Sequence, residues 1–174
     1  MDKLEVLKQV FGHEGFREGQ ERLVDEVLGG HDVLGVMPTG AGKSVCYQLP
    51  ALMLEGVTLV ISPLISLMKD QVMALKASGV AAAYINSSLT PGQQAEAIRR
   101  AAAGAYRIIY VAPERLDMPQ FVAFAKQARI PLLAVDEAHC VSQWGQDFRP
   151  SYLRIVQFID SLPKRPVVGA FPAT

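Results

Sequence analysis

The stretch Val36-Met37-Pro38-Thr39-Gly40-Ala41-Gly42-Lys43-Ser44 decides the fold expected for this chain. Residues 33–36 form an apolar run that indicates a short buried strand, and residues 45–52 indicate the first turns of a helix. A glycine-rich loop ending in Gly-Lys-Ser between a strand and a helix is typical of a P-loop. Its backbone N–H groups and the helix N-terminus hold phosphate oxygens. Lys43 is then expected to reach the β- and γ-phosphates, and Ser44 to ligate Mg²⁺.

The phosphate-binding interpretation has one departure and one alternative. The general pattern has glycine five residues before Gly42, where this chain has Met37. The alternative is a glycine-rich turn that binds no ligand. The residues expected to contact nucleotide through this loop are Met37, Pro38, Thr39, Gly40, Ala41, Gly42, Lys43 and Ser44.

The composition limits the class of protein. The chain has 174 residues, of which 50% are hydrophobic, so one domain with a sizeable core is expected. A formal net charge of zero indicates that any nucleic-acid binding depends on local geometry rather than on a general positive charge. Apolar runs are too short to span a membrane, and residues 1–5 lack a signal-peptide core. Cys46 and Cys140 form no CxxC, so no zinc is expected in this segment, and a cytoplasmic location fits.

Strand and helix patterns alternate along the chain. One helix is expected at about residues 2–11, and a second helix is expected to end at Gly29. Residues 1–30 would thus form a helical preface ahead of a nucleotide-binding lobe at 31–174. Strands are expected at 57–61, 81–85, 107–111, 131–135 and 167–171, with helices between them at 62–78, from Pro91, at 119–128 and up to about 162. Several strands are apolar on both faces, which predicts an α/β fold with a mostly parallel sheet covered by helices on both sides. Ligands of such sheets bind at the carboxyl ends of the strands.

Asp136-Glu137 ends the most apolar strand and supplies a second half to the nucleotide site. Asp136 is expected to hold Mg²⁺, and Glu137 to act as general base on the attacking water. The alternative is a pair of exposed carboxylates that cap the next helix. His139 follows, either facing the γ-phosphate or bonded to nearby backbone at a helix start.

The motifs together resemble the superfamily 2 helicases of DEAH-box type, and most of all the RecQ DNA helicases. Besides residues 38–44 and Asp136-Glu137-Ala138-His139, the resemblance covers the helicase motifs 0, Ia, Ib and III and an aromatic-rich loop. Motif 0 lies at residues 16–20, motif Ia at 62–71, motif Ib at 110–116, the aromatic-rich loop at 140–150 and motif III at 170–174. The resemblance implies a RecA-like lobe that uses ATP and Mg²⁺ to move 3′→5′ on single-stranded DNA and unwind duplexes in repair and recombination.

The resemblance also implies how adenine is bound. Gln20 corresponds to a glutamine whose amide reads adenine, Arg17 lies against one face of the base, and His13 stands where many relatives have an aromatic residue. The alternative for Phe16-Arg17 is ordinary packing at a helix start.

DNA contacts are expected from the aromatic-rich loop and from loops at the strand ends. Trp144, Phe148 and Arg149 are the main candidates, because aromatic faces stack on any base for about 1–3 kcal/mol. The alternative is a small satellite core beneath this loop. Backbone contacts are expected from Ser66, Lys69, Ser87 and Arg115, for which a solvated loop or a helix cap is an equal alternative.

Two coupling positions depart from the family pattern. Gln146 stands where relatives often carry histidine, and Pro172 where they carry threonine or serine, while Thr174 is retained. We expect Gln146 and Thr174 to couple DNA binding to hydrolysis, more weakly than in the usual pattern.

The family resemblance implies partners beyond residues 1–174. A second RecA-like lobe with an arginine finger, a zinc module and a winged helix are expected in the full-length protein, and these residues alone are expected to be poorly active. Single-stranded DNA and duplex junctions are the expected substrates. Two other hypotheses remain: an RNA helicase or remodeller on the same fold, and a binding module without enzymatic activity.

Overall fold

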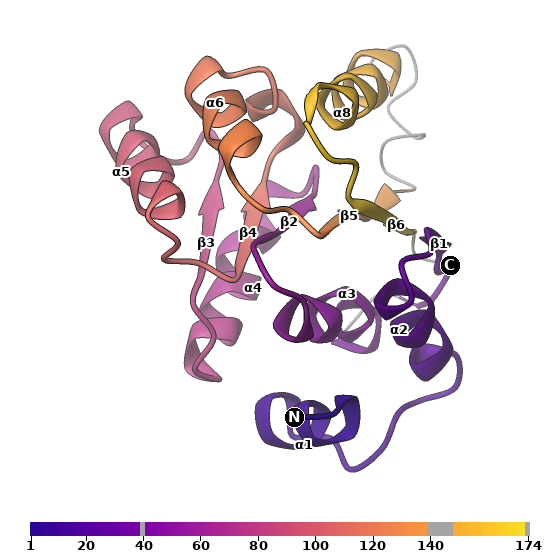
Figure 1. Cartoon of the computed structure of the whole chain (residues 1–174). Coiled ribbons are helices and arrows are strands. Elements are labelled where there is room, and N and C mark those ends of the chain that lie inside the picture. The colour runs from indigo at the N-terminus through magenta and orange to yellow at the C-terminus, as the bar shows by residue number, and fades with distance from the viewer. Residues whose placement is uncertain (39–40, 139–147, 173–174) are drawn as a thin grey trace.

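A parallel six-stranded sheet forms the centre of the molecule (Figure 1). The computed structural model describes residues 1–38, 41–138 and 148–172, without the side chains of residues 41 and 148–152. The strands are β1 (Val33–Leu34), β2 (Thr58–Ile61), β3 (Ala82–Ile85), β4 (Ile108–Val111), β5 (Leu132–Asp136) and β6 (Val167–Phe171). Their order is β1-β6-β5-β2-β4-β3, and every pairing is parallel. The predicted α/β class is confirmed.

Helices cover both faces of the sheet (Figure 1). One face packs against α2 (Gln20–Leu28), α3 (Ala41–Met53) and α4 (Ile65–Ala77), in a core that includes Cys46, Tyr47, Met68 and Tyr110. The other face packs against α5 (Pro91–Ala102), α6 (Pro119–Gln127) and α8 (Phe148–Ser161), in a core that includes Phe121 and Phe158. Because both faces are covered, β2, β4 and β5 are buried along their whole length.

The first helix, α1 (Lys3–Phe11), forms an additional layer outside α3. A small core joins Val6 and Leu7 of α1 to Val24 of α2 and to Val45 and Leu49 of α3. The helical preface therefore packs directly on the helix that follows the phosphate loop.

The structure corrects three predicted boundaries. Helix α3 begins at Ala41 rather than at Val45. Helix α4 begins at Ile65 rather than at Ser62, because the Ser62 hydroxyl accepts a hydrogen bond from the Leu64 N–H at 3.2 Å and forms a turn before the helix. Strand β1 ends at Leu34 rather than at Val36, although the Gly35 N–H still donates to the Ala170 carbonyl of β6 at 2.9 Å. The prediction that this strand is buried is wrong, since Leu34 is 69% exposed at the edge of the sheet. The predicted start of α5 is confirmed, with Thr90 as N-cap in a capping box with Gln93.

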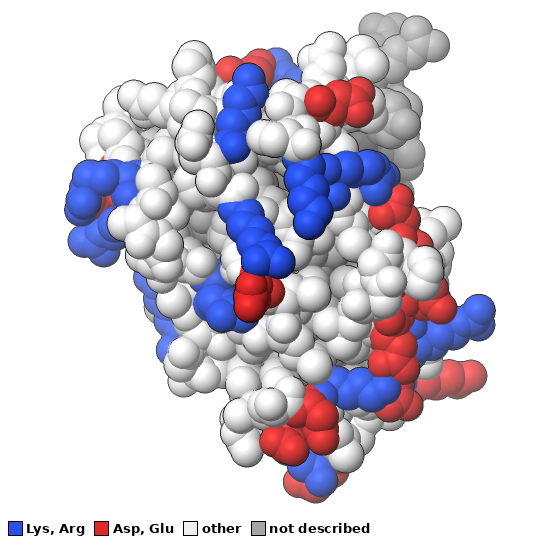
Figure 2. Space-filling model, in the orientation of Figure 1, with Lys and Arg blue, Asp and Glu red and all other residues white. Residues whose placement is uncertain are grey.

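Charged side chains are mixed on the surface. On the face in Figure 2, basic and acidic groups lie side by side, as expected for a chain of zero formal net charge. None of the helices in the described part of the chain is long and apolar enough to cross a membrane.

Asp32 fastens the short strand β1 to the start of β6. Its carboxylate accepts hydrogen bonds from the Val168 N–H at 2.9 Å and from the Arg165 guanidinium at 2.8 and 3.1 Å. The Arg165 side chain lowers the pKa of Asp32 from its ordinary value of 3.8; burial opposes this, and the Val168 N–H lowers the pKa further. The ionised form is therefore the one that the fold stabilises.

We expect Asp32→Ala to lower the free energy of unfolding at pH 7 by about 1 kcal/mol, a modest value because the pair is half exposed. The folded-state pKa of Asp32 is depressed, so this stability is present above the unfolded value and is lost as pH falls through the folded one. Urea unfolding at pH 7 and pH 3 measures the effect. Asp117→Ala, at an exposed carboxylate 3.6 Å from Arg154, is the control. An equal effect of Asp32→Ala at both pH values would contradict the assignment.

Candidate nucleotide-binding site

The carboxyl edge of the sheet brings the two predicted halves of the site together. Strand β6 lies between β1, which leads into the phosphate loop, and β5, which ends at Asp136. Helix α3 starts at Ala41 above this edge and carries Lys43 and Ser44 in its first turn. Residues more than ninety positions apart in sequence are therefore in direct contact, as the side chains of Lys43 and Glu137 show.

Lys43 forms a buried ion cluster with both carboxylates. Its Nζ lies 2.6 Å from Glu137 Oε1 and 3.1 Å from Asp136 Oδ1. Lys43 is 2% exposed, and Asp136 and Glu137 are each 6% exposed. The alternative of two exposed carboxylates that cap a helix is therefore wrong. An ammonium group shared by two buried carboxylates is positioned to exchange one of them for another anion, such as a phosphate oxygen.

The backbone at Glu137 is held in an unusual conformation. Its φ of 54° lies in the left-handed region, and among the described residues it is the only non-glycine residue with positive φ. The Glu137 N–H donates to Asp136 Oδ1 at 2.8 Å, which supports this turn at the end of β5. Left-handed backbone at a non-glycine residue costs of order 1–3 kcal/mol and is concentrated at functional sites. The turn aims both carboxylates at Lys43.

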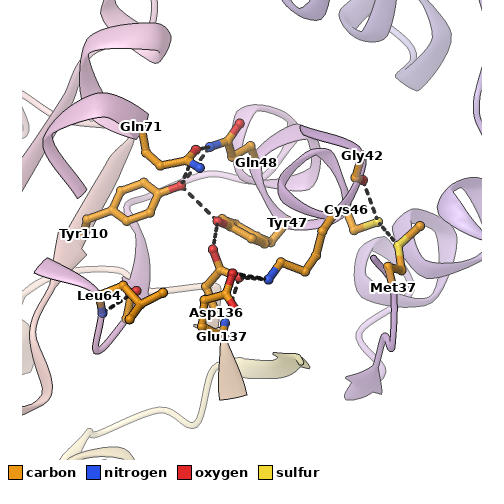
Figure 3. A network of polar contacts seen from close by, with 12 residues as sticks. Met37, Gly42, Cys46, Tyr47, Gln48, Leu64, Gln71, Tyr110, Asp136 and Glu137 are labelled. Carbon is orange, nitrogen blue, oxygen red and sulfur yellow. Dashed lines mark hydrogen bonds and ion pairs between the residues drawn. The ribbon is translucent and has the colours of Figure 1, made fainter. Parts of the chain in front are cut away.

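Asp136 has a second partner on the side away from Lys43. The Tyr47 hydroxyl of α3 donates to Asp136 Oδ2 at 2.6 Å (Figure 3). Burial raises the pKa of Tyr47 well above its ordinary value, with further contributions from Tyr110 and Asp136. The hydroxyl is therefore protonated at neutral pH and acts as a donor to the carboxylate.

The predicted adenine-reading segment contacts the phosphate loop. Gln20 is 3% exposed; its Oε1 accepts from the Arg17 N–H at 2.7 Å, and its Nε2 donates to the Gly42 carbonyl at 2.8 Å. A Cβ on Gly42 would lie 3.3 Å from Gln20 Nε2 and 3.4 Å from Arg17 Nη1, so glycine permits this close approach. The carboxamide has two N–H groups and two lone pairs, and these bonds use one of each.

Met37 departs from the glycine pattern without straining the loop. Its φ is not positive, so its conformation does not require glycine. Its N–H donates to the Pro172 carbonyl at 3.3 Å, and its sulfur lies 3.4 Å from Cys46 Sγ. Burial raises the pKa of the Cys46 thiol to about 12, so this cysteine is an inert packing group beside the loop.

A cavity of about 80 Å³ opens beside the carboxylates. It is lined by Lys43, Ser44, Ser62, Leu67, Met68, Gln71, Tyr110, Asp136 and Glu137. The hydroxyl and carboxylate oxygens of Ser44 and Asp136 are the donor type that Mg²⁺ prefers, so these residues fit that ion. Among the described residues, no cluster of three or more His, Cys, Asp or Glu could hold a metal by itself. A larger cavity of about 370 Å³, lined in part by Val27, Lys126 and Arg165, contains none of the predicted site residues.

The other predicted contacts lie at the surface. Ser66 and Lys69 are exposed in the first turns of α4, and Ser87 is exposed after β3. Arg115 is half-buried in the short 3-10 helix η1 (Pro113–Arg115), and its Nε lacks a protein partner among the described residues. Pro38 and Arg17 are exposed, while His13 lines a cavity of about 380 Å³ together with Ser44 and Gln48.

Several predicted site residues lie outside the described part of the chain. These are Thr39, Gly40, His139, Trp144, Gln146 and Thr174. The side chains of Ala41, Phe148 and Arg149 are likewise outside it, although Phe148 and Arg149 begin helix α8. Their proposed roles remain predictions.

Sequence reasoning missed a set of buried and half-buried polar residues that are linked to Asp136 through Tyr47. They are Tyr47, Gln48, Gln71 and Tyr110. One signal was available, since Tyr47 follows Lys43 by one helical turn and so shares its side of α3. Nothing in the sequence indicated that Tyr110, in an otherwise apolar strand, would meet it.

Comparisons with known proteins agree with this geometry. The DEAD/DEAH box helicase family matches residues 17–174. The chain is 50% identical over 172 residues to the ATP-dependent DNA helicase RecQ of Bacillus subtilis, covering 97% of this chain and 29% of that protein. It is 48% identical over 166 residues to the RecQ of Haemophilus influenzae, covering 95% of this chain and 27% of that protein. The chain thus spans less than a third of these relatives.

Solved structures support the fold. The DUF1998 helicase MrfA bound to DNA aligns with a TM-score of 0.78 at 18% identity, covering 100% of this chain and 26% of that one. A hypothetical ATP-dependent RNA helicase from Sulfolobus tokodaii aligns with a TM-score of 0.78 at 22% identity, covering 99% of this chain and 50% of that one. At these identities the likeness concerns the fold.

We expect Lys43→Met to lower the free energy of unfolding by about 3–5 kcal/mol, because it leaves two adjacent buried carboxylates without this cation. Adding Glu137→Gln should recover part of the loss by removing one negative charge. Urea unfolding at pH 7 measures both effects. Lys69→Met, at an exposed lysine, is the control and should change stability by less than about 0.5 kcal/mol. Equal stabilities of the two lysine variants would show that the ion cluster does not stabilise the fold.

Proposed function

Because the chain belongs to the DEAD/DEAH box helicase family and has RecQ DNA helicases among its relatives, we propose that it is the ATP-binding motor lobe of a DNA helicase. The observation that carries this proposal is the buried contact of Lys43 with Asp136 and Glu137 at the carboxyl edge of the sheet. A P-loop lysine beside two strand-end carboxylates is the arrangement that nucleotide hydrolysis requires.

In this proposal the triphosphate changes the partners of Lys43. The three N–H donors of its ammonium turn from the carboxylates to the β- and γ-phosphates, while the N–H groups at the start of α3 hold the phosphate oxygens. Ser44 and Asp136 would hold Mg²⁺, which would neutralise part of the negative charge of the phosphates. Glu137, released from Lys43, accepts a proton from the attacking water. His139 is proposed to contact the γ-phosphate region.

Adenine is proposed to bind where residues 13–20 meet the phosphate loop. The Gln20 carboxamide is held by Arg17 and Gly42, which fixes its plane. Its second N–H and second lone pair then suit N7 and N6 of adenine. The exposed Arg17 side chain would cover one face of the base, and His13 the other.

DNA is proposed to lie across the loops at the same sheet edge. Ser66, Lys69, Ser87 and Arg115 would contact phosphates, and Trp144, Phe148 and Arg149 would stack on bases. Gln146 and Thr174 would couple the two sites. The support for these roles is the sequence resemblance, together with the exposure of Ser66, Lys69 and Ser87 in the structure.

The finer parts of the proposal concern the whole protein. We propose 3′→5′ movement on single-stranded DNA, unwinding of duplex junctions in repair and recombination, and a cytoplasmic, DNA-associated location. Residues 1–30 would serve as the adenine-reading preface and residues 31–174 as the lobe. A second RecA-like lobe would supply an arginine finger, and a zinc module and a winged helix would complete the protein. Residues 1–174 alone should therefore hydrolyse ATP slowly.

The decisive experiment measures ATP hydrolysis by the complete gene product with single-stranded DNA, with RNA and with neither. We expect DNA to stimulate the rate at least tenfold, RNA to have little effect, and Lys43→Ala to abolish hydrolysis. Stimulation by RNA would favour an RNA helicase. Equal rates in all three conditions would favour a remodeller, and binding without hydrolysis would favour a binding module.

We expect Gln20→Ala to reduce the preference for ATP over GTP by about tenfold or more, because a bidentate pair to adenine discriminates by about 1–3 kcal/mol. Dissociation constants of fluorescent ATP and GTP analogues measure this ratio. Gln127→Ala, at an exposed glutamine ending α6, is the control. If Gln20→Ala weakened both nucleotides equally, the side chain would be structural only.

A further inference from the structure

A chain of hydrogen bonds, buried near Asp136 and partly buried near Gln71, runs from Asp136 to helix α4 (Figure 3). Tyr47 donates to Asp136 Oδ2 at 2.6 Å, and the Tyr47 and Tyr110 hydroxyl oxygens are 3.0 Å apart. Gln48 Nε2 lies 2.8 Å from the Tyr110 hydroxyl and 3.3 Å from Gln71 Oε1. These residues come from α3, β4 and α4, and three of them, Tyr47, Gln48 and Tyr110, are at most 5% exposed.

The donor and the acceptor can be assigned for the hydrogen bonds that lead to Asp136. The single proton of Tyr47 goes to Asp136, so the Tyr47 oxygen accepts from Tyr110. The Tyr110 oxygen in turn accepts from Gln48. The bonds from Gln48 to Tyr110, from Tyr110 to Tyr47 and from Tyr47 to Asp136 thus all point toward the carboxylate, and successive bonds of this kind strengthen one another in a buried setting. This chain of hydrogen bonds fixes Asp136 Oδ2, while Lys43 contacts Oδ1.

Tyr110 has one proton and two possible acceptors. The Tyr47 oxygen lies at 3.0 Å, and Gln71 Oε1 on α4 lies at 3.5 Å. A shift of α4 toward β4 by a few tenths of an ångström would make Gln71 the better acceptor. Tyr47 would then lose the bond that supports its contact with Asp136. The cavity beside Gln71, Tyr110 and Asp136 leaves space for such a shift.

We propose that Tyr47 is a positioning residue for the Asp136 carboxylate, and that Tyr110 links this carboxylate to helix α4 through Gln71. Helix α4 carries the exposed Ser66 and Lys69 in its first turns, so a ligand that moves this helix changes the support of Asp136. By reciprocity, a metal held by Asp136 changes the setting of α4. The metal part of this inference rests on the proposed nucleotide function, whereas the link to α4 is a property of the fold.

The first test measures how far Mg²⁺ increases the affinity of the purified chain for a fluorescent ATP analogue. Tyr47→Phe keeps the ring, which packs 5.3 Å from that of Phe171, and removes the hydroxyl. We expect it to reduce the gain from Mg²⁺ by about three- to tenfold while the affinity without Mg²⁺ changes less than twofold. Tyr84→Phe is the matched control, because Tyr84 lies beside Tyr110 on the neighbouring strand β3 but is not one of the residues of the hydrogen-bond chain described above. An unchanged gain from Mg²⁺ in Tyr47→Phe would overturn the positioning role.

The second test is a double-mutant cycle on the link. Gln71→Leu removes the competing acceptor, so we expect it to increase the gain from Mg²⁺ when Tyr110 is present. In a Tyr110→Phe background it should have no effect, because the shared proton is gone. The same effect in both backgrounds would overturn the link.

The third test needs no nucleotide and therefore separates this inference from the proposed function. Tyr110→Phe should change amide hydrogen exchange in α4 at least threefold in the nucleotide-free chain, and Tyr84→Phe should not. If the unaltered chain binds no ATP analogue, the proposed function fails, and the exchange result still decides the link. Unchanged exchange in Tyr110→Phe would reject it. Thermal unfolding of every variant verifies that it is folded.

Discussion

The contact of Lys43 with Asp136 and Glu137 is the interaction on which the arrangement of this edge depends. The side chain of Lys43 is 2% exposed and those of Asp136 and Glu137 are 6% exposed, so all three charges are nearly excluded from water. They are tolerable only because the Lys43 ammonium lies within 3.1 Å of an oxygen of each carboxylate. The helix after the phosphate loop and the end of β5 are thereby held together. A cluster of this kind is also ready to accept an anion, since Lys43 can exchange one carboxylate partner for another.

The order of the strands creates this contact. Strand β6 is last in the chain but lies between β1 and β5, so the phosphate loop and the Asp-Glu pair approach each other only when the sheet is complete. Met37 and Gly35 both bond to the end of β6, and Asp32 bonds to its start. The last strand therefore fixes the position of a loop that precedes it by more than a hundred residues.

The buried polar chain adds a second support to Asp136. One of its oxygens is held with Lys43 and the Glu137 N–H, and the other with Tyr47. The orientation of the carboxylate is thus set by groups from α3, from the turn that follows β5 and, through Tyr110, from β4. Such polar groups in an otherwise apolar core are costly unless each is satisfied, and here each hydroxyl and amide has a neighbour within 3.5 Å.

The sequence by itself determined the parallel α/β class, the glycine-rich loop, the Asp-Glu strand end and the start of α5 at Pro91, because each depends on residues that are close in the chain. Local patterns also predicted most helix and strand bounds. They missed the end of β1, and they missed the start of α4, which a side-chain turn at Ser62 moves to Ile65. Only the tertiary structure decided that Glu137 adopts a left-handed backbone, that Gly42 admits Gln20, and that Tyr47 and Tyr110 meet at Asp136. These features depend on strand order and on helix packing between distant segments. Periodicity and spacing carry no information about which buried side chains of different elements will face each other.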